Sequence, residues 1–216
     1  MPRLLLPFLS SFFLLLGEGL VLAQLPLARL STVFPPGGKV GSEFEVTVSG
    51  ADLDEANQLH FSNPGITAKQ KTGANGLPEA NKFVISIATS LMTGIYEVRV
   101  VGRFGISNPR AFVVSDLSEI IAPTTNNSAR NVVPIPLETI VNGHCEANAA
   151  SFYKFAAKKG QRVLIECKAK EIDSRMDAAL ILYDTTGKEL QRARGGNLLD
   201  FTPEGRGKNW YPSLKY

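Results

Sequence analysis

The chain contains few of the residues on which catalytic sites depend. Its 216 residues include two histidines, two cysteines and one tryptophan. A Ser-His-Asp triad needs a histidine that contacts a serine and is oriented by a carboxylate, and the G-x-S-x-G motif of many serine hydrolases does not occur. His144 and Cys145 are adjacent in the sequence, but neighbours on a strand point to opposite faces, which makes them a poor catalytic pair. These absences predict a protein that is not an enzyme.

Patterns that bind metals are also scarce. Zinc would need ligands from two separate regions, without paired C-x-x-C spacing: His60, His144, Cys145 and Cys167. Carboxylates that could bind calcium occur near predicted loops in two sets, Asp52, Asp54 and Glu55, then Asp173, Asp177 and Asp184. Neither set has the spacing of an EF-hand loop. We expect no metal and no cofactor, with calcium as the one alternative and turn capping as the ordinary role of these carboxylates.

Charge of one sign is not concentrated anywhere in the chain. The 23 basic and 20 acidic residues are interspersed, and the formal net charge of +3 does not predict binding to nucleic acid or to an anionic membrane. Aromatic residues make up 8% of the chain and recur at alternate positions, as in a strand core. No segment has a sustained helical stripe of apolar residues, and 19 glycines and 13 prolines favour a turn-rich, all-β fold.

One long apolar run is present, at the N-terminus. Arg3 supplies a positive charge, residues 4–16 are mostly apolar, and Val21 and Ala23 stand at the −3 and −1 positions of a cleavage site. The run is shorter than the roughly 20 apolar residues of a membrane helix, although an uncleaved anchor is the alternative. Residues 1–23 are therefore predicted to be the signal peptide of a secreted, periplasmic or cell-surface protein, with no transmembrane segment after cleavage.

Residues 25–115 have the pattern of about seven short strands separated by turns, which predicts an immunoglobulin-like β-sandwich. Apolar and polar residues alternate at 44–48 and 83–87. Two further motifs are the G-x-Y-x-V-x-V strand at 94–100 and the S-N-x-x-x-F-x-V strand at 107–114. With the Pro-Pro-Gly-Gly turn that precedes them, these motifs resemble the TIG-type immunoglobulin-like domains of bacterial surface and exported proteins.

Residues 151–190 are the densest run of strand-like sequence. Alternate residues at 163–167 share an apolar face, whereas 178–183 is apolar on both faces, which is typical of a central strand; a short buried helix is the alternative. Residues 184–187, Asp-Thr-Thr-Gly, have the composition of a hairpin turn. The charged segment 189–194 would return as an edge strand.

Several motifs between residues 126 and 190 resemble one bacterial family. They are Asn126-Asn127, Ala129, Pro136, Val141-Asn142-Gly143, Tyr153-x-Phe155, Gly160-Gln161, Asp177 and the run LILYDTTGKEL at 180–190. Together they resemble the pre-peptidase C-terminal domain, a jelly-roll β-sandwich found beside secreted peptidases. The resemblance implies a role in secretion, localisation or substrate attachment, and not the peptidase activity itself.

The chain departs from that family after Phe201, where the family continues with further strands. Residues 202–216 show no strand period and are predicted to be an irregular tail. The second sandwich, residues 135–201, would then lack its closing strands. In that case the apolar faces of Val163, Ile165 and Leu180 would be incompletely covered, and a strand edge would be exposed.

A polar segment and the two cysteines give two further expectations. Residues 116–134 are polar and predicted to be an interdomain linker; they contain the sequon Asn126-Asn127-Ser128, which we interpret as a chance match. Cys145 and Cys167 are candidates for a disulfide in an exported protein, with two buried thiols as the alternative.

These patterns together predict an all-β protein of two tandem β-sandwiches, immunoglobulin-like and then jelly-roll-like, the second incomplete. We expect a non-catalytic exported protein for adhesion, surface display or binding of an extracellular or cell-envelope protein or polysaccharide. One alternative is the non-catalytic accessory end of a secreted hydrolase. Another is a periplasmic carbohydrate-binding protein.

Overall fold

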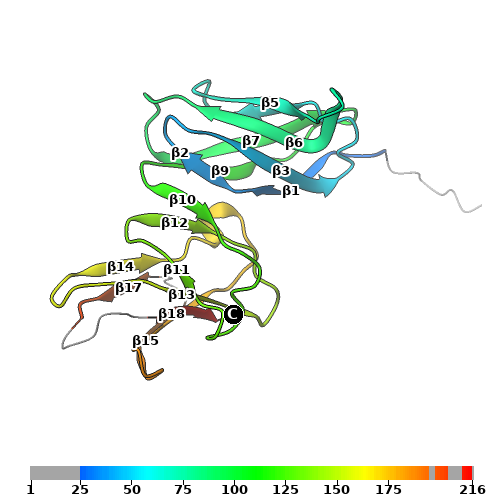
Figure 1. Ribbon diagram of the computed structural model, residues 1–216. Coiled ribbons are helices and arrows are strands. Elements are labelled where there is room, and N and C mark those ends of the chain that lie inside the picture. Colours follow the sequence, from blue (N-terminus) through cyan, green and yellow to red (C-terminus); the bar gives the residue numbers. More distant parts are fainter. Residues whose placement is uncertain (1–24, 195–197, 204–210, 216) are drawn as a thin grey trace, which may run out of the picture.

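The computed structural model describes residues 25–194, 198–203 and 211–215 (Figure 1). Two β-rich units follow one another along the chain. Apart from one 3-10 turn, η1 (Lys170–Ile172), the regular structure of these residues consists of strands, which confirms the predicted all-β class. No helix in the described ranges has the length and hydropathy needed to cross a bilayer. The predicted signal peptide, residues 1–23, lies outside the described residues.

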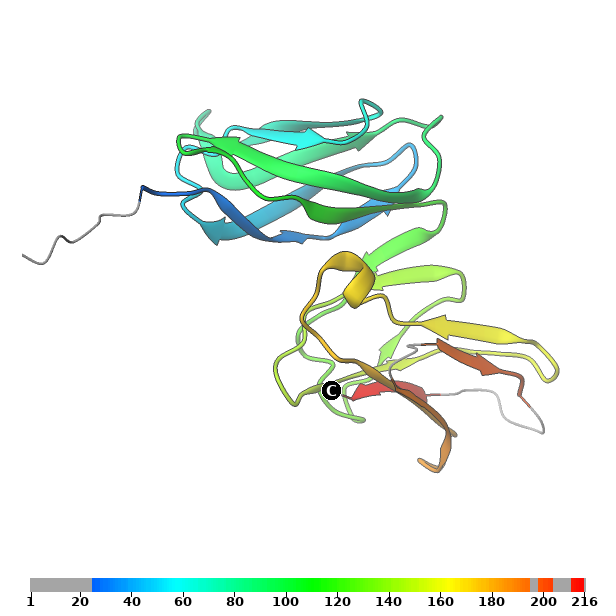
Figure 2. The ribbon, with the colours of Figure 1, turned by 180° about the vertical axis from the view of Figure 1, so that it is seen from behind.

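The first unit is a sandwich of two sheets (Figure 2). One sheet contains, in spatial order, β1 (Arg29–Phe34), β3 (Glu43–Ala51), β6 (Pro78–Ile87) and β5 (Ile66–Thr72). The other contains β2 (Gly37–Lys39), β9 (Arg110–Ser115), β7 (Gly94–Gly102) and β4 (Gln58–Phe61), with β8 (Gly105–Ile106) added to β7. This arrangement confirms the predicted β-sandwich.

The core of the first unit follows the alternation in the sequence. Phe83, Ile85 and Ile87 of β6 are buried on one face, as the period of two predicts. Phe112 of β9 lies at the centre with none of its surface exposed. Its ring contacts Phe61 edge to face, with centroids 5.2 Å apart, and lies parallel to the ring of Phe44 at 6.4 Å. Seventeen buried residues form this core among those described.

The second unit has one larger sheet and one narrow ribbon. The sheet contains, in spatial order, β11 (Val133–Pro134), β13 (Ala150–Lys154), β18 (Tyr211–Lys215), β15 (Ala179–Tyr183) and β16 (Glu189–Arg194). The ribbon is formed by β14 (Val163–Glu166) and β17 (Leu198–Phe201). A parallel pair, β10 (Ser118–Ile121) and β12 (Thr139–Asn142), also belongs to the second unit and lies on its side nearest the first unit in Figure 1.

The hairpin of β15 and β16 confirms the strand predictions for this region. Leu180, Ile181 and Leu182 are all buried, so β15 is covered on both faces. The turn closes through the backbone N–H of Asp184, which donates to the carbonyl of Lys188 at 2.9 Å. β16 is the last strand of its sheet, as its charged sequence predicts.

The prediction of an irregular tail at 202–216 is wrong for its last strand. β18 lies between β13 and β15 and pairs with both in antiparallel register. Its short sequence has no alternation that would reveal a strand, but the two flanking strands offer backbone groups that need partners. Pro212, which lacks an N–H, pairs with Leu182 but lies beyond the part of β18 that pairs with β13.

Two further expectations are corrected. The segment predicted as a linker, 116–134, contains β10 and β11, because parallel pairing with β12 and β13 satisfies its backbone. The apolar side chains of the second unit were expected to be incompletely covered. Val163 and Leu180 are in fact buried, whereas Ile165 is half-buried. Phe155, Leu182 and Leu199 pack in the same cluster. That core is small, with six buried residues among those described.

A carboxylate at the start of the second unit gives a prediction about pH. Asn142 Nδ2 donates to Glu119 Oε2 at 2.7 Å, and burial raises the pKa of Glu119 above its usual value. Between the usual and the raised pKa the folded chain binds more protons than the unfolded chain, so this group lowers stability as the pH rises through that window. Glu119→Gln keeps the hydrogen-bond acceptor and has no charge to bury. We expect Glu119→Gln to gain stability relative to the wild type as the pH is raised from about 4 to 7, measured by urea denaturation. The prediction is wrong if the difference in free energy of unfolding between Glu119→Gln and the wild type is the same at both pH values.

Candidate functional site

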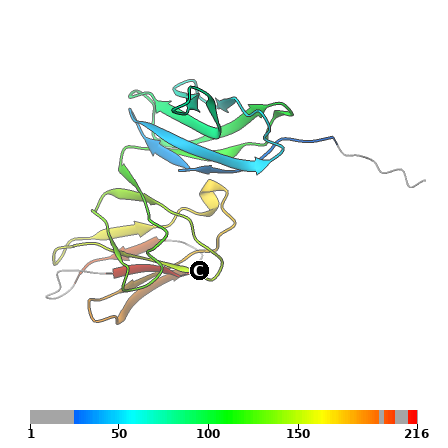
Figure 3. The same ribbon diagram turned by 45° about the vertical axis from the view of Figure 1, so that its right-hand side comes forward.

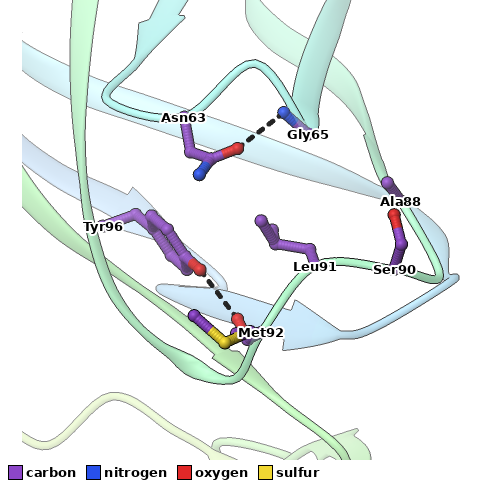
Figure 4. Close-up of a pocket in the computed structure, with 7 residues that line it drawn as sticks. All are labelled: Asn63, Gly65, Ala88, Ser90, Leu91, Met92 and Tyr96. Carbon is purple, nitrogen blue, oxygen red and sulfur yellow. Dashed lines mark hydrogen bonds between the residues drawn. The ribbon is translucent and has the colours of Figure 1, made fainter.

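An open hollow of about 400 Å³ lies at one end of the first unit (Figure 4). It is formed by the turn between β4 and β5, the connection between β6 and β7, and the start of strand β7. The lining residues are Asn63, Gly65, Ala88, Ser90, Leu91, Met92 and Tyr96. The chain leaves the first unit at the same end, because Gly94 at the start of β7 pairs with Val114 near the end of β9. We refer to this site as the Tyr96 hollow.

Tyr96 supports the wall of the hollow. Its hydroxyl donates a hydrogen bond of 2.8 Å to the carbonyl of Met92, four residues earlier, and its ring packs against the core. A tyrosine near the start of this strand that bonds back to the preceding corner is the tyrosine corner of immunoglobulin-like sandwiches. Val98, which is fully buried, stands two residues later, where antibody domains have a cysteine. The G-x-Y-x-V-x-V motif of the sequence marks the position of Tyr96, but alternation alone does not predict this hydrogen bond.

The rest of the lining is neutral. Asn63 Oδ1 accepts the N–H of Gly65 at 2.8 Å, which leaves the Asn63 amide nitrogen without a hydrogen bond among the described residues. In Figure 4 that nitrogen points into the space between Tyr96 and Leu91. Met92 is 80% exposed. The hollow therefore offers a hydrogen-bond donor, an aromatic ring and an apolar side chain, with no carboxylate, amine or imidazole in its lining.

A second hollow, of about 450 Å³, lies around the loop between β3 and β4 and has an acidic lining that includes Asp52, Asp54 and Glu55. Two of these carboxylates have local partners. Asp52 Oδ2 accepts the N–H of Leu27 at 3.1 Å, and Glu55 lies 3.5 Å from Arg103. In the described ranges no three histidine, cysteine or acidic side chains are grouped so that they could hold a metal ion. The first set of carboxylates, for which calcium was the alternative, is therefore not grouped as a metal site among these residues.

The second set of carboxylates is divided among three structural roles. Asp184 Oδ1 accepts the N–H groups of Thr186 and Lys188, which caps the hairpin turn. The hydroxyl of Thr186 donates to the same oxygen at 2.6 Å, and this bond, together with the two backbone bonds, lowers the pKa of Asp184 below its usual value. Asp177 lies 3.9 Å from Lys170, and Asp173 contacts the first unit. Turn capping thus accounts for Asp184, as the sequence suggested.

The histidines and cysteines do not converge on one site. His60 lies on β4, whereas the ring of His144 contacts that of Phe34 with centroids 3.9 Å apart. Cys145 and Cys167 are half-buried thiols, and the structure contains no disulfide between them. Burial, with a smaller effect from nearby acidic groups that include Cys145, raises the pKa of Cys167 to about 11. The predicted disulfide remains a prediction.

The sequon at Asn126 is inaccessible. Asn126 is 4% exposed, and its carbonyl accepts the N–H of Phe152 at 2.8 Å. Its side-chain nitrogen is buried without a hydrogen-bond partner. A glycan needs an exposed asparagine, so the folded chain cannot carry one there.

The tyrosine corner gives a stability prediction. We expect Tyr96→Phe to lower the free energy of unfolding of the first unit by about 1 kcal/mol, because it removes one hydrogen bond and leaves the Met92 carbonyl to water. Urea denaturation measures this loss. Tyr183→Phe is the matched control, since the Tyr183 hydroxyl makes no hydrogen bond among the described residues and the ring is also half-buried. The role of the tyrosine corner is contradicted if Tyr96→Phe and Tyr183→Phe lower the free energy of unfolding of their own units by equal amounts.

Comparisons with known proteins give the chain no family. No family model and no curated protein matches it, so the resemblances to TIG-type and pre-peptidase C-terminal domains remain predictions. A glycan-binding protein of Bacteroides ovatus, SGBP-B of a mixed-linkage glucan utilization locus, solved with a heptasaccharide, is 9% identical, with a TM-score of 0.32; the match covers 90% of this chain and 77% of that one.

Two other solved structures are similarly distant. The secreted serine protease VesC of Vibrio cholerae is 11% identical, with a TM-score of 0.21; 83% of this chain is matched to 44% of that one. Chicken CNTN1 domains FN1–FN3 are 11% identical, with a TM-score of 0.23; 88% of this chain is matched to 55% of that one. The chain thus spans about half the length of these two structures, and likenesses this distant say nothing of its ligand.

Proposed function

We propose that the chain is a non-catalytic, exported binding protein whose first unit holds a neutral saccharide in the Tyr96 hollow. The lining of that hollow carries the proposal: one aromatic ring, one amide donor without a partner among the described residues, and one exposed thioether, with no charged side chain. Ligand sites combine apolar contact area with a few placed polar groups in this way. The N-terminal pattern at residues 1–23 supports export to the cell surface, the periplasm or the medium.

The chemistry of the lining favours a neutral ligand over an ionic one. A sugar ring has apolar faces that suit the ring of Tyr96 and the side chain of Met92, and hydroxyls that can accept from Asn63. A phosphate or carboxylate ligand is bound most strongly by a cationic side chain, and the lining of the hollow has none. The partner would then be a neutral extracellular or cell-envelope polysaccharide, and the protein would serve in adhesion or surface attachment.

Calorimetric titration of the purified chain tests the proposal. The probes are the neutral polysaccharides β-glucan, xylan and mannan, the charged polysaccharide alginate, and collagen as a protein ligand. We expect binding to at least one neutral polysaccharide. Asn63→Asp keeps the oxygen that accepts from Gly65 and removes the NH₂ donor, so affinity should fall about tenfold. Met92→Ala should also weaken binding, because it removes apolar contact area.

The matched control lies outside the Tyr96 hollow. Leu77 is 63% exposed in the loop between β5 and β6, and Leu77→Ser should leave the affinity unchanged. Absence of binding to every neutral polysaccharide would refute the proposal. Binding to collagen alone, or binding that survives both Asn63→Asp and Met92→Ala, would refute it as well.

A further inference from the structure

One carboxylate joins the two units. Asp173, directly after η1 in the second unit, accepts the backbone N–H of Ala111 in β9 through its Oδ2 at 2.7 Å. Arg110 Nη2 donates to the carbonyl oxygen of Asp173 at 2.9 Å. Figure 3 shows η1, in yellow, next to the first unit. Both the side chain and the main chain of Asp173 are thus bound by the start of β9.

The N–H that Asp173 binds is one that the first unit leaves open. Backbone groups of alternate strand residues point to the same side, and the N–H of Val113 donates to the carbonyl of Pro36 on the β2 side of the sheet. Ala111, two residues earlier, points to that side too. β2 pairs with β9 only from Val113 onward, so Ala111 has no strand partner there. The carboxylate of Asp173 takes the place of a strand carbonyl.

The local backbone fixes Asp173 in position. Its φ of 58° and ψ of 21° lie in the left-handed region, which aspartate, asparagine and glycine adopt most readily. Its own N–H donates to the carbonyl of Lys170, which closes η1, and the N–H of Ser174 donates to the carbonyl of Ala169. The carboxylate is therefore presented by a closed turn and not by a free loop.

A second contact between the units involves another strand of the first unit. The ring of Phe34, at the end of β1, packs on that of His144, which follows β12. The chain crossing after β9 and the two contacts, one on β9 and one on β1, together restrict rotation of one unit against the other. We propose that Asp173 and His144 lock the two sandwiches into one rigid body, with Asp173 completing the open edge of β9.

A locked orientation has a consequence for binding. Surfaces on the two units keep a fixed relation before any ligand arrives, so a ligand that contacts both does not have to order them. The lock goes beyond the saccharide proposal and does not depend on it, since its test uses no ligand.

Amide hydrogen exchange and ¹⁵N relaxation of the full chain test the lock. In the wild type we expect a protected Ala111 amide and one rotational correlation time for both units. Asp173→Gly keeps the left-handed turn and removes the carboxylate, so exchange at Ala111 should accelerate by about tenfold to a hundredfold. Asp173→Asn keeps an acceptor oxygen and should retain most of the protection. Combining Asp173→Gly with His144→Ala should give the two units separate correlation times.

The amide signals of β6 and β15 report whether each unit is still folded in the variants. The proposal fails if the wild type itself shows two correlation times, which requires no variant to fold. It also fails if exchange at Ala111 is the same in the wild type and in Asp173→Gly.

Discussion

Phe112→Ala is expected to lower the free energy of unfolding of the first unit by about 3–5 kcal/mol, the usual cost of truncating a fully buried phenylalanine. The side chain has no exposed surface and contacts the rings of Phe44 and Phe61 from the two sides of the core. Both ring contacts are lost, and the rigid sheets can close over the cavity only in part. Urea denaturation followed by the amide signals of β6 measures the loss.

Two controls make this result specific. Phe44 is only half-buried, so Phe44→Ala should cost clearly less than Phe112→Ala. The signals of β15 should change little, because Phe112 belongs to the core of the first unit and the second unit has its own. Equal costs for the two variants would contradict the central position of Phe112.

Oxidation of Cys145 and Cys167 is expected to raise the free energy of unfolding of the second unit by about 3 kcal/mol. The gain comes from the loop that the disulfide closes, which reduces the entropy of the unfolded chain. Oxidised glutathione supplies the oxidant: the two thiols lose two protons and two electrons, one S–S bond forms, and the glutathione disulfide is reduced to two thiols. The second unit has a small core, so a cross-link there matters more than it would in the first.

The pKa of Cys167 sets the conditions for this oxidation. A thiolate is the attacking species, and a pKa of about 11 leaves little thiolate on Cys167 at neutral pH. The reaction should therefore accelerate as the pH is raised, and the product should have lost the mass of two hydrogen atoms. Cys145→Ser is the control, which should show no gain in stability with the same oxidant. Full alkylation of both cysteines after exhaustive oxidation would contradict the pairing.

Local sequence patterns were sufficient to predict the strands in which buried and exposed side chains alternate. Ile85 and Phe83 face the core because successive residues of a strand point to opposite sides, a property of the backbone itself. The doubly apolar run at 179–183 was buried on both faces for the same reason, and Gly187 closes the hairpin with a φ of +85°. The carboxylate of Asp184 caps that turn within four residues of itself, so its role could also be read locally.

Long-range pairing could not be predicted in this way. β18 has no alternation, and its place between β13 and β15 depends on strands that lie far from it in the sequence. β10 lies in a polar segment and is a strand because β12 runs beside it. In both cases the partner, and not the intrinsic preference of the segment, decides the structure.

The sequence by itself determined the class of fold, the faces of the alternating strands and the turns, because these follow from the period of the backbone and from glycine, proline and aspartate at fixed places. Only the tertiary structure decided where Asn63, Met92 and Tyr96 form a hollow, and that Asp173 reaches Ala111 some sixty residues earlier. Such contacts depend on how whole sheets pack and cross, and no local window of residues contains that information.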